Sequence, residues 1–319
     1  MTVALDLWRL SATELAEGIR GGRFRSIEVV EAHLRRIEEV NASVNAVVHV
    51  MAEQALDLAR AADRSVAAGA ALPPFHGVPF TVKELIDVAG TPTTQGLKAL
   101  ASAYPTTDAP AVERLKTAGA IPIGRTNMPS ASVRWHCDSE LWGPTLNPWD
   151  RSRTPGASSA GEAVAVATGM SPLGLGSDGL GSLRHPAQCC GVAALKPTLG
   201  RVAAASSVEP PDTATIGMQL TGVVGPLART VADLRGAFEV LAGPTWRDPW
   251  SVPAPLAPGE TAGPVAVAVV VDPAGHGTAK QVQAGVRAAA DALADAGYVV
   301  DELEPPGIDA AAEALLVML

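Results

Sequence analysis

The sequence predicts an α/β fold, with a mixed, mostly parallel sheet covered by helices on both faces. Short apolar runs of strand length alternate along the chain with longer segments whose apolar residues recur at helical spacing. Of the 319 residues, 47% are hydrophobic and 18% are charged, so the chain can bury a substantial core. No internal repeat emerges. We therefore expect one α/β domain rather than a repeat array.

The first part of the chain is expected to form a helical layer. A capping-box spacing begins a helix from Ser11 to Arg20, and an alanine-rich helix follows from Met51 to Ala68. Between them, Ser26 is expected to cap a helix whose apolar residues share one face, namely Ile27, Val30, Leu34, Ile37 and Val40. These helices cover the core and supply no chemistry.

The middle of the chain predicts a β–α–β rhythm. The expected elements are a strand over Gly77–Val82, a helix over Ala109–Ala118, a strand over Ile121–Gly124, a helix over Ala163–Thr168, a strand over Pro172–Gly176 and a loop over Gly176–Ser182. Ser159 and Glu162 have the capping-box spacing before the second helix. Lys83 ends the first strand, on the face opposite Val78, Phe80 and Val82.

The C-terminal part predicts a second strand–helix–strand unit. The expected elements are a helix capped by Thr230 and Asp233 and ending at Gly243, strands over Val265–Val271 and Tyr298–Leu303, a helix over Lys280–Ala296 and an apolar helix from Ile308 onward. We expect a single domain over 1–319, made of a helical layer (1–70), a catalytic core (71–243), a surface loop (244–263) and a strand–helix–strand unit (264–319). The last helix ends without a cap, so we expect the chain to be truncated there.

Composition and charge narrow the classes of function. The net charge of −9 and the absence of a basic stripe argue against a nucleic-acid partner. The three cysteines form no metal-binding pattern, and no H-x-x-H motif is present, so neither a metal nor a cofactor is expected. Neither a signal peptide nor an apolar run of about 18 residues is found. We expect a cytoplasmic protein with no membrane association and a small-molecule substrate.

One stretch, residues 153–197, carries hydroxyls among glycines. Ser158 and Ser159 precede a predicted helix, and Ser182 lies in the glycine-rich loop that follows a predicted strand. Serines in such places are usually N-caps or turn residues, so the pattern alone does not establish catalysis. A G-x-G-x-x-G spelling over Gly174–Gly179 lacks the acidic residue expected about 20 positions later, which excludes a dinucleotide site.

Several blocks in order resemble the amidase signature family. They are GVPFTVKELID from Gly77, TNMP from Thr126, GPTLNPWD from Gly143, GASSAGEAVAVATG from Gly156 and GSDGLGSLRHPAQCCGVAALKPTLGRV from Gly176. The resemblance covers most of the chain and is strongest over 76–202. It implies hydrolysis of a carboxamide to a carboxylate and ammonia or an amine, through an acyl-enzyme on serine. Relatives continue well beyond the point that corresponds to the end of this chain.

The resemblance also implies the roles of individual residues. Ser182 corresponds to the nucleophile, Ser158 to a bridging serine that follows a cis peptide bond, and Lys83 to the general base. An oxyanion hole would be formed by the backbone amides of Gly179, Leu180 and Gly181. Physical chemistry fits the role of Lys83, because burial among apolar groups lowers the pKa of a lysine and makes it a base.

Other residues are weaker candidates for a substrate pocket, namely Trp135, His136 and Trp142. They indicate an apolar or aromatic acyl group, although tryptophan more often packs in the core. The substrate itself is not predicted, and a homodimer is one possible assembly.

Departures from the family pattern leave two alternatives open. Relatives usually carry glycine where this chain has Leu180 and Ala157, and a leucine forced to positive φ would be strained. One alternative is a degenerate, non-catalytic member that serves in binding or assembly. The other is an amidotransferase A-type subunit, which would require a partner protein.

Overall fold

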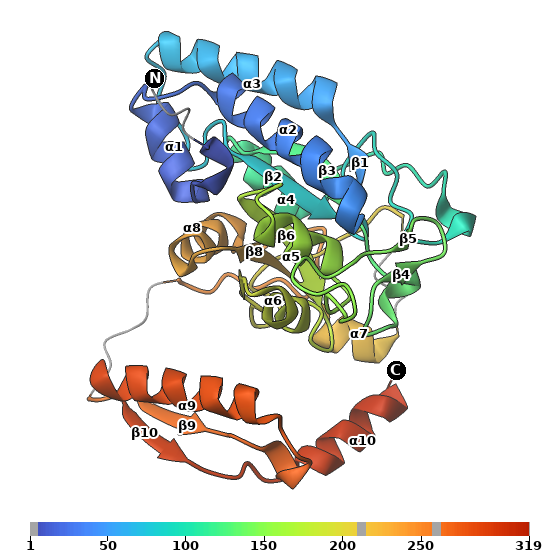
Figure 1. Ribbon diagram of the computed structural model, residues 1–319, viewed down its shortest axis with the longest axis vertical. Coiled ribbons are helices and arrows are strands. Elements are labelled where there is room, and N and C mark those ends of the chain that lie inside the picture. Colours follow the sequence, from blue (N-terminus) through green and yellow to red (C-terminus); the bar gives the residue numbers. More distant parts are fainter. Residues whose placement is uncertain (1–5, 209–214, 257–262, 319) are drawn as a thin grey trace. The chain divides into compact units, whose positions relative to one another are not determined.

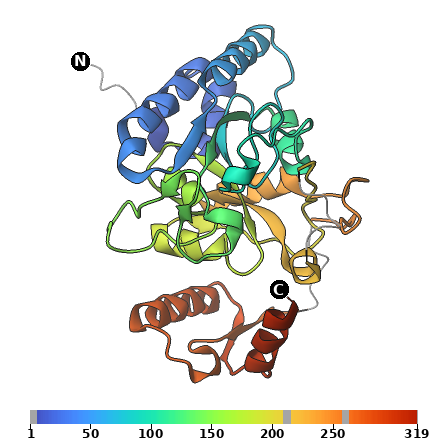
Figure 2. The ribbon, with the colours of Figure 1, turned by 90° about the vertical axis from the view of Figure 1, so that its right-hand side faces the viewer.

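The computed structural model describes residues 6–208, 215–256 and 263–318. The chain divides into two compact units (Figures 1 and 2). The first consists of Met1–Ala214 and Met218–Ala254, and the second of Thr215–Gly217 and Pro255–Leu319. Each unit is described by itself below.

The first unit is built on a six-stranded sheet. Its strand order is β1 (Val47–Val50), β3 (Ile121–Thr126), β2 (Pro79–Lys83), β6 (Leu173–Asp178), β8 (Val223–Ala228) and β7 (Ala193–Ala194). β3, β2 and β6 are parallel, whereas β1 is antiparallel to β3 and β8 is antiparallel to both β6 and β7. Four of these six strands therefore run in one direction, which confirms a mixed, mostly parallel sheet.

Helices cover both faces of this sheet. One apolar core joins the sheet to α1 (Ala12–Arg20), α4 (Pro110–Thr117) and α8 (Val231–Leu241). A second core joins the opposite face to α2 (Ser26–Val44), α3 (Ala52–Ala67) and α5 (Ala160–Ala167). The remaining short elements are η1 (Leu7–Arg9), η2 (Lys98–Leu100), η3 (Ser130–Ser132), β4 (Asp138–Ser139), β5 (Gly143–Pro144), α6 (Arg184–Cys190) and α7 (Ile216–Thr221). The predicted α/β layering is confirmed.

The second unit contains the predicted strand–helix–strand arrangement. β9 (Ala266–Val269) and β10 (Val299–Glu302) pair in parallel, and α9 (Lys280–Asp295) connects them. A short 3-10 turn, η4 (Pro273–Gly275), follows β9, and α10 (Ile308–Met318) follows β10.

One predicted helix cap is wrong and a second lacks its side-chain hydrogen bond. Ser26 is the first residue of α2 instead of its cap, and its hydroxyl donates to the carbonyl of Gly77. Ser159 does stand at the N-cap of α5 but makes no side-chain cap bond, because its hydroxyl bonds the backbone of Ser177. Glu162, the expected partner in that capping box, is turned into the protein interior instead. Both serines are used to join elements that are distant in the sequence.

Strand ends also differ from the prediction. β6 continues through Ser177 and Asp178, and β3 through Arg125 and Thr126, because pairing with neighbouring strands extends regular structure into polar residues. β8 was not predicted because its sequence, VVGPLA, combines glycine and proline, which usually interrupt strands. Polar side chains at the ends of β2, β3 and β6 are consequently held on a rigid sheet.

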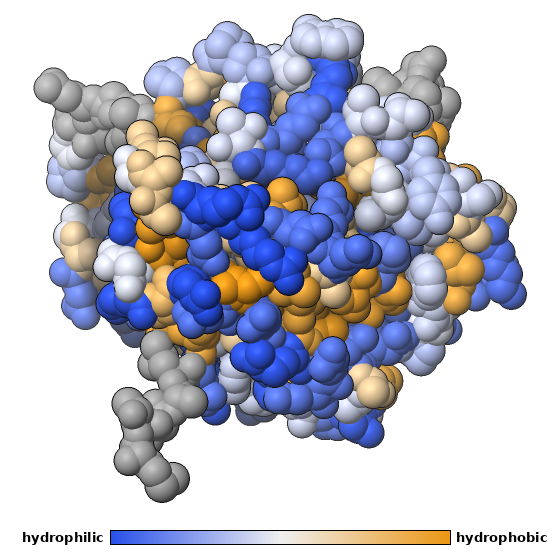
Figure 3. All heavy atoms as spheres, turned by 90° about the horizontal axis from the view of Figure 1, so that it is seen from above, coloured by the Kyte–Doolittle hydropathy of each residue, from blue (hydrophilic) through white to orange (hydrophobic). Residues whose placement is uncertain are grey.

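No helix among the described residues is long and apolar enough to cross a membrane. Figure 3 looks onto the end of the first unit that α1, α2 and α3 form in Figure 1, where hydrophilic side chains predominate and hydrophobic ones lie in strips between them.

Candidate active site

Lys83 is held at the C-terminal end of β2 by the alternation of the strand. Phe80 and Val82 belong to one apolar core, so Lys83 projects to the opposite face, toward the beginning of α5. Its side chain is fully buried, and Nζ lies 2.6 Å from Ser158 Oγ and 2.9 Å from Ser177 Oγ. The structure therefore brings Lys83 and Ser158 into contact, and Ser177 is an additional neighbour.

Burial changes the acid–base behaviour of Lys83. Removal from water lowers the pKa of the amine to about 7, although electrostatic interactions with Cys137, Asp178 and Glu162 act in the opposite direction. Near neutral pH a large fraction of Lys83 is therefore uncharged. An uncharged amine has a lone pair and can accept a proton from a neighbouring hydroxyl.

Ser158 lies in an unusual backbone segment. The Ala157–Ser158 peptide bond is cis, in agreement with the expectation from the family resemblance. The residue after it, Ser159, donates its amide to the carbonyl of Ser182 at 3.1 Å. This bond brings the backbone of the nucleophile candidate next to the bridging serine candidate.

Ser182 is half-buried at the start of the turn into α6. Within the described part of the chain, its hydroxyl forms no hydrogen bond, and none connects it to Ser158 Oγ. Of the three predicted residues, Lys83 and Ser158 are joined by a side-chain hydrogen bond. Ser182 lies next to them through the backbone hydrogen bond between its carbonyl and the amide of Ser159. The Ser182 hydroxyl remains available to a bound molecule.

The backbone amides of the loop differ in their availability. Gly181 donates its amide to Asp178 Oδ1 at 2.7 Å, so this predicted oxyanion-hole amide already has an acceptor in the observed loop conformation. The amides of Gly179, Leu180 and Ser182 make no hydrogen bond to any described residue. The Ser182 amide was not predicted, although it belongs to the same run of free donors.

Asp178 fixes the conformation of this loop. Its Oδ2 accepts from the amide of Leu183 at 3.0 Å and from Arg184 Nε at 3.0 Å, while Oδ1 accepts from Gly181 and from Arg184 Nη2 at 3.0 Å. Burial by itself would raise the pKa of Asp178, but hydrogen bonds from Arg184 and from the two amides lower it below its usual value. The carboxylate is therefore ionised and holds both sides of Ser182.

We expect Asp178→Asn to destabilise the protein and slow any chemistry at Ser182. Asparagine offers one acceptor oxygen, and its amide group would face donors, so the free energy of unfolding should fall by about 1.5–3 kcal/mol. A displaced loop should also lower kcat by roughly 10²-fold. Denaturant unfolding and steady-state rates test this, with Arg184→Gln as the milder control because the Arg184 side chain is 57% exposed. Unchanged kcat in a destabilised Asp178→Asn variant would contradict it.

Leu180 is not strained. It is absent from the residues that have positive φ, whereas the neighbouring Gly181 has φ of 112° and requires glycine. The concern raised by the family pattern at this position therefore does not apply to the observed loop.

We expect Leu180→Gly to retain activity and to lower the free energy of unfolding by about 0.4–1 kcal/mol, through the greater freedom of the unfolded chain. Thermal melting and turnover measure the two effects. A higher melting temperature would show that leucine is strained at this position after all.

The predicted pocket residues lie in different environments. Trp135 is 62% exposed and packs edge-on against His185, with ring centroids 5.2 Å apart. A Cβ atom on Gly181 would lie 3.8 Å from the Trp135 ring, which places this indole beside the loop of Ser182. His136 is exposed and its side chain bonds no described residue. The Trp142 side chain is held by a hydrogen bond, because its Nε1 donates to Glu84 Oε2 at 2.9 Å.

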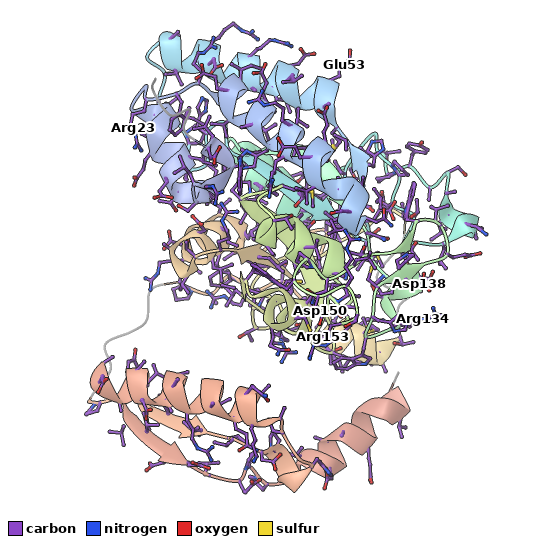
Figure 4. All side chains as sticks on the ribbon, in the orientation of Figure 1. Arg23, Glu53, Arg134, Asp138, Asp150 and Arg153 are labelled. Atoms are coloured by element: carbon purple, nitrogen blue, oxygen red, sulfur yellow. The ribbon has the colours of Figure 1, made fainter. Side chains whose placement is uncertain are left out.

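Trp135 belongs to a surface loop whose charged neighbours Arg134 and Asp138 are labelled in Figure 4, beside β4 and β5. His185 was missed in the sequence, although it follows Ser182 by one helical turn and its Nδ1 accepts the amide of Ala157 at 3.3 Å. Trp135 and His185 are therefore the aromatic side chains that border the candidate site.

Other contributors were also missed by sequence reasoning, namely Ser177, Asp178, Arg184 and Glu162. The spacing of Asp178, Ser182 and Arg184 within GSDGLGSLR offered a signal, because an acid and a base flanked the serine. Across 6–208, 215–256 and 263–318, no group of three His, Cys, Asp or Glu side chains is arranged to bind a metal ion.

Comparison with known proteins identifies the family of this chain. The sequence model of the family described as Amidase matches residues 28–319. An indoleacetamide hydrolase from Bradyrhizobium diazoefficiens is 45% identical over 95% of this chain and 58% of its own length. The A-type subunit of a glutamyl-tRNA(Gln) amidotransferase from Salinispora arenicola is 40% identical over 94% of this chain and 62% of its own.

The structural comparison gives the same answer. A bacterial aryl acylamidase of the amidase signature family superimposes with a TM-score of 0.84 and 28% identity, over 97% of this chain and 64% of its own. The chain thus spans about 60% of the length of the curated relatives described above. From the family match over most of its length, the chain belongs to the amidase family, the amidase signature enzymes.

Proposed function

We propose that the protein hydrolyses a carboxamide through an acyl-enzyme formed on Ser182, with Ser158 as proton carrier and Lys83 as base. The observation that carries the proposal is the fully buried Lys83 amine, 2.6 Å from the Ser158 hydroxyl and lowered in pKa to about 7. Burying a lysine without a salt-bridged carboxylate costs free energy, and buried groups with a shifted pKa are typical of catalytic sites.

The first step forms a carbon–oxygen bond. Ser182 Oγ attacks the amide carbonyl carbon, its proton passes to Ser158 Oγ, and the proton of Ser158 passes to Lys83 Nζ. The carbonyl electron pair moves onto oxygen, and the amides of Leu180 and Ser182, which bond no described residue, would donate to that oxyanion. Asp178 supports the step by holding the loop in place.

The second step breaks the carbon–nitrogen bond. The Lys83 ammonium returns its proton through Ser158 to the leaving nitrogen, which departs as ammonia or an amine. Water then attacks the ester on Ser182 with the same proton path, releases the carboxylate and restores the serine. Lys83 must be uncharged at the beginning of each half-reaction.

An aromatic or other planar apolar acyl group is the proposed substrate class. Trp135 and His185 form an aromatic edge beside Gly181, where the substrate carbonyl would lie. The relative named as an indoleacetamide hydrolase supports this choice, because the acyl part of indoleacetamide carries an aromatic ring.

The similarity to the A-type subunit of a glutamyl-tRNA(Gln) amidotransferase favours one second candidate, a chain that works with a partner protein. A degenerate member would bind without turnover. We favour an enzyme over a degenerate member because Lys83, Ser158 and Ser182 are all retained.

The test has two parts, carried out on the whole protein. A fluorophosphonate should label one serine per chain, identified as Ser182 by peptide mapping, and a panel of aryl and aliphatic primary amides should release ammonia with a preference for aryl compounds. Labelling without turnover of any amide would favour the partner-dependent role. Absence of both would reject the proposal.

We also propose that residues 1–319 belong to one amidase domain, since the family match runs through both units without interruption.

A further inference from the structure

Glu162 is a buried acid whose side chain connects α5 to two strands. Its carboxyl group is fully buried, Oε2 accepts from Thr81 Oγ1 at 2.6 Å, and Oε1 accepts from Thr126 Oγ1 at 2.7 Å. Thr81 lies on β2 and Thr126 on β3, and Thr126 is the register partner of Lys83. One carboxyl group therefore joins the start of a helix to the two strands beside Lys83.

This connection runs next to the Lys83–Ser158 contact. Thr81 precedes Lys83 by two residues on the same face of β2, a separation of roughly 6.6 Å. Ser158 precedes Glu162 by four residues at the start of α5. The contacts Thr81–Glu162 and Lys83–Ser158 thus join the same two segments at neighbouring points.

We propose that Glu162 is a positioning residue, whose two hydrogen bonds set the distance between Lys83 Nζ and Ser158 Oγ. The inference rests on the proposed function, because that distance matters only if a proton crosses it. Glu162 itself touches neither Lys83 nor Ser158 by a hydrogen bond among the described residues, so its effect is transmitted through β2, β3 and α5.

The surroundings are shaped to hold this carboxyl group. A Cβ atom on Gly174 of β6 would collide with Glu162 Oε2, so glycine is required there for the close approach. Glu162 takes no part in capping α5. Burying an acid costs free energy that an apolar side chain of similar size would not, and so a packing role alone does not explain it.

The protonation state of Glu162 is compatible with an uncharged Lys83. Burial raises the pKa of its carboxyl to about 8, although the hydrogen bonds from Thr81 and Thr126 and the charges of Arg125 and Lys83 act against this. Below that pH the carboxyl is mostly protonated, and it then donates to one threonine hydroxyl and accepts from the other. A protonated Glu162 does not stabilise an ammonium on Lys83.

Other titratable groups near Lys83 vary less in this pH range. Burial raises the pKa of the Cys137 thiol to about 11, and so it is uncharged. Asp178 is held ionised by Arg184. Glu162 is therefore the neighbour of Lys83 whose charge changes around neutral pH.

The experiment compares Glu162→Gln with Glu162→Leu. Glutamine preserves the size and both hydrogen bonds, so kcat should fall by no more than about threefold, while leucine should lower kcat by roughly 10²-fold with little change in KM. Fluorophosphonate labelling of Ser182 should slow in parallel. Because Glu162 is already mostly protonated where Lys83 titrates, the acid limb of kcat/KM in the Gln variant should stay close to that of the wild type.

A second pair of variants tests the inference if Glu162→Leu does not fold. Thr126→Val removes one hydroxyl at constant shape and should lower kcat by roughly tenfold. Its matched control is Thr93→Val, because Thr93 is also buried but its hydroxyl has no partner among the described residues. Thr93→Val should leave kcat unchanged.

Several results would overturn the inference. They are a folded Glu162→Leu or Thr126→Val variant with wild-type kcat, a loss confined to KM, or a Gln variant as slow as the Leu variant. A shifted acid limb in the Gln variant would also overturn it, because Glu162 would then act through its charge and not through its hydrogen bonds. Wild type and Ser182→Ala are measured in parallel. If the wild type shows no labelling that depends on Ser182, the proposed function fails, whereas normal labelling in all Glu162 variants rejects the positioning role alone.

Discussion

Replacing Ser182 with alanine should abolish amide turnover and leave the fold intact. The change removes one half-buried hydroxyl that bonds no described residue, so little stability depends on it. Removal of a serine nucleophile from another hydrolase costs on the order of 10⁶ in kcat. We expect a loss of similar size, with a residual rate over water from the remaining groups.

The measurement combines ammonia release, fluorophosphonate labelling and thermal melting. Ser152→Ala is the matched control, because Ser152 is an exposed serine on a nearby loop that bonds only Asp150. Its activity, labelling and melting temperature should equal those of the wild type. Near-normal turnover by Ser182→Ala would reject Ser182 as the nucleophile, whatever the labelling shows.

The sequence predicts the layers of this fold well where the hydrophobic period is regular. α2 and β2 were anticipated because their apolar residues repeat at about 3.6 and at 2 residues, respectively. β8 could not be anticipated, because Gly225 and Pro226 interrupt it locally and only pairing with β6 and β7 makes it a strand.

The candidate site was predictable in its types of residue but not in its connections. The family resemblance placed Lys83 beside Ser158, and the structure agrees. The spacing of Ser159 and Glu162 indicated a capping box that does not form. A pattern of neighbouring residues cannot show that Thr81 and Thr126 lie within reach of the Glu162 carboxyl group. Those contacts join residues 36 and 81 positions apart, and only the assembled sheet brings them together.

The sequence also did not show that the amide of Gly181 is bonded to Asp178. A glycine-rich loop indicates free amides, but which amides remain free depends on where Asp178 points. Asp178 was assigned to the loop from sequence, whereas it ends β6 and aims its carboxylate back at the turn.

The second large effect concerns Lys83, where Lys83→Arg should be nearly inactive even though it conserves the positive charge. Arginine cannot deprotonate in a protein, so it supplies no base and should lower kcat by roughly 10²–10⁴-fold. Wild-type activity should fall toward acid pH with an apparent pKa near the value of about 7 held by the buried amine. An active arginine variant together with a flat acid limb would exclude Lys83 as the base.

Stability gives an independent test, because it does not require turnover. Lys83 has a pKa of about 7 in the folded protein against an ordinary value of 10.5, so between these values the unfolded chain binds one more proton. The contribution of Lys83 to the free energy of unfolding should therefore rise with pH from about 7 to 10.5, by up to ~1.4 kcal/mol per pH unit, and stay constant below pH 7. Lys83→Met removes the titration, so the difference in unfolding free energy between wild type and this variant should grow from about pH 7.5 to about pH 9.5 in favour of the wild type. Parallel curves over that interval would mean that the lysine stays protonated in the folded protein, and the proton path from Ser182 through Ser158 would then have no acceptor.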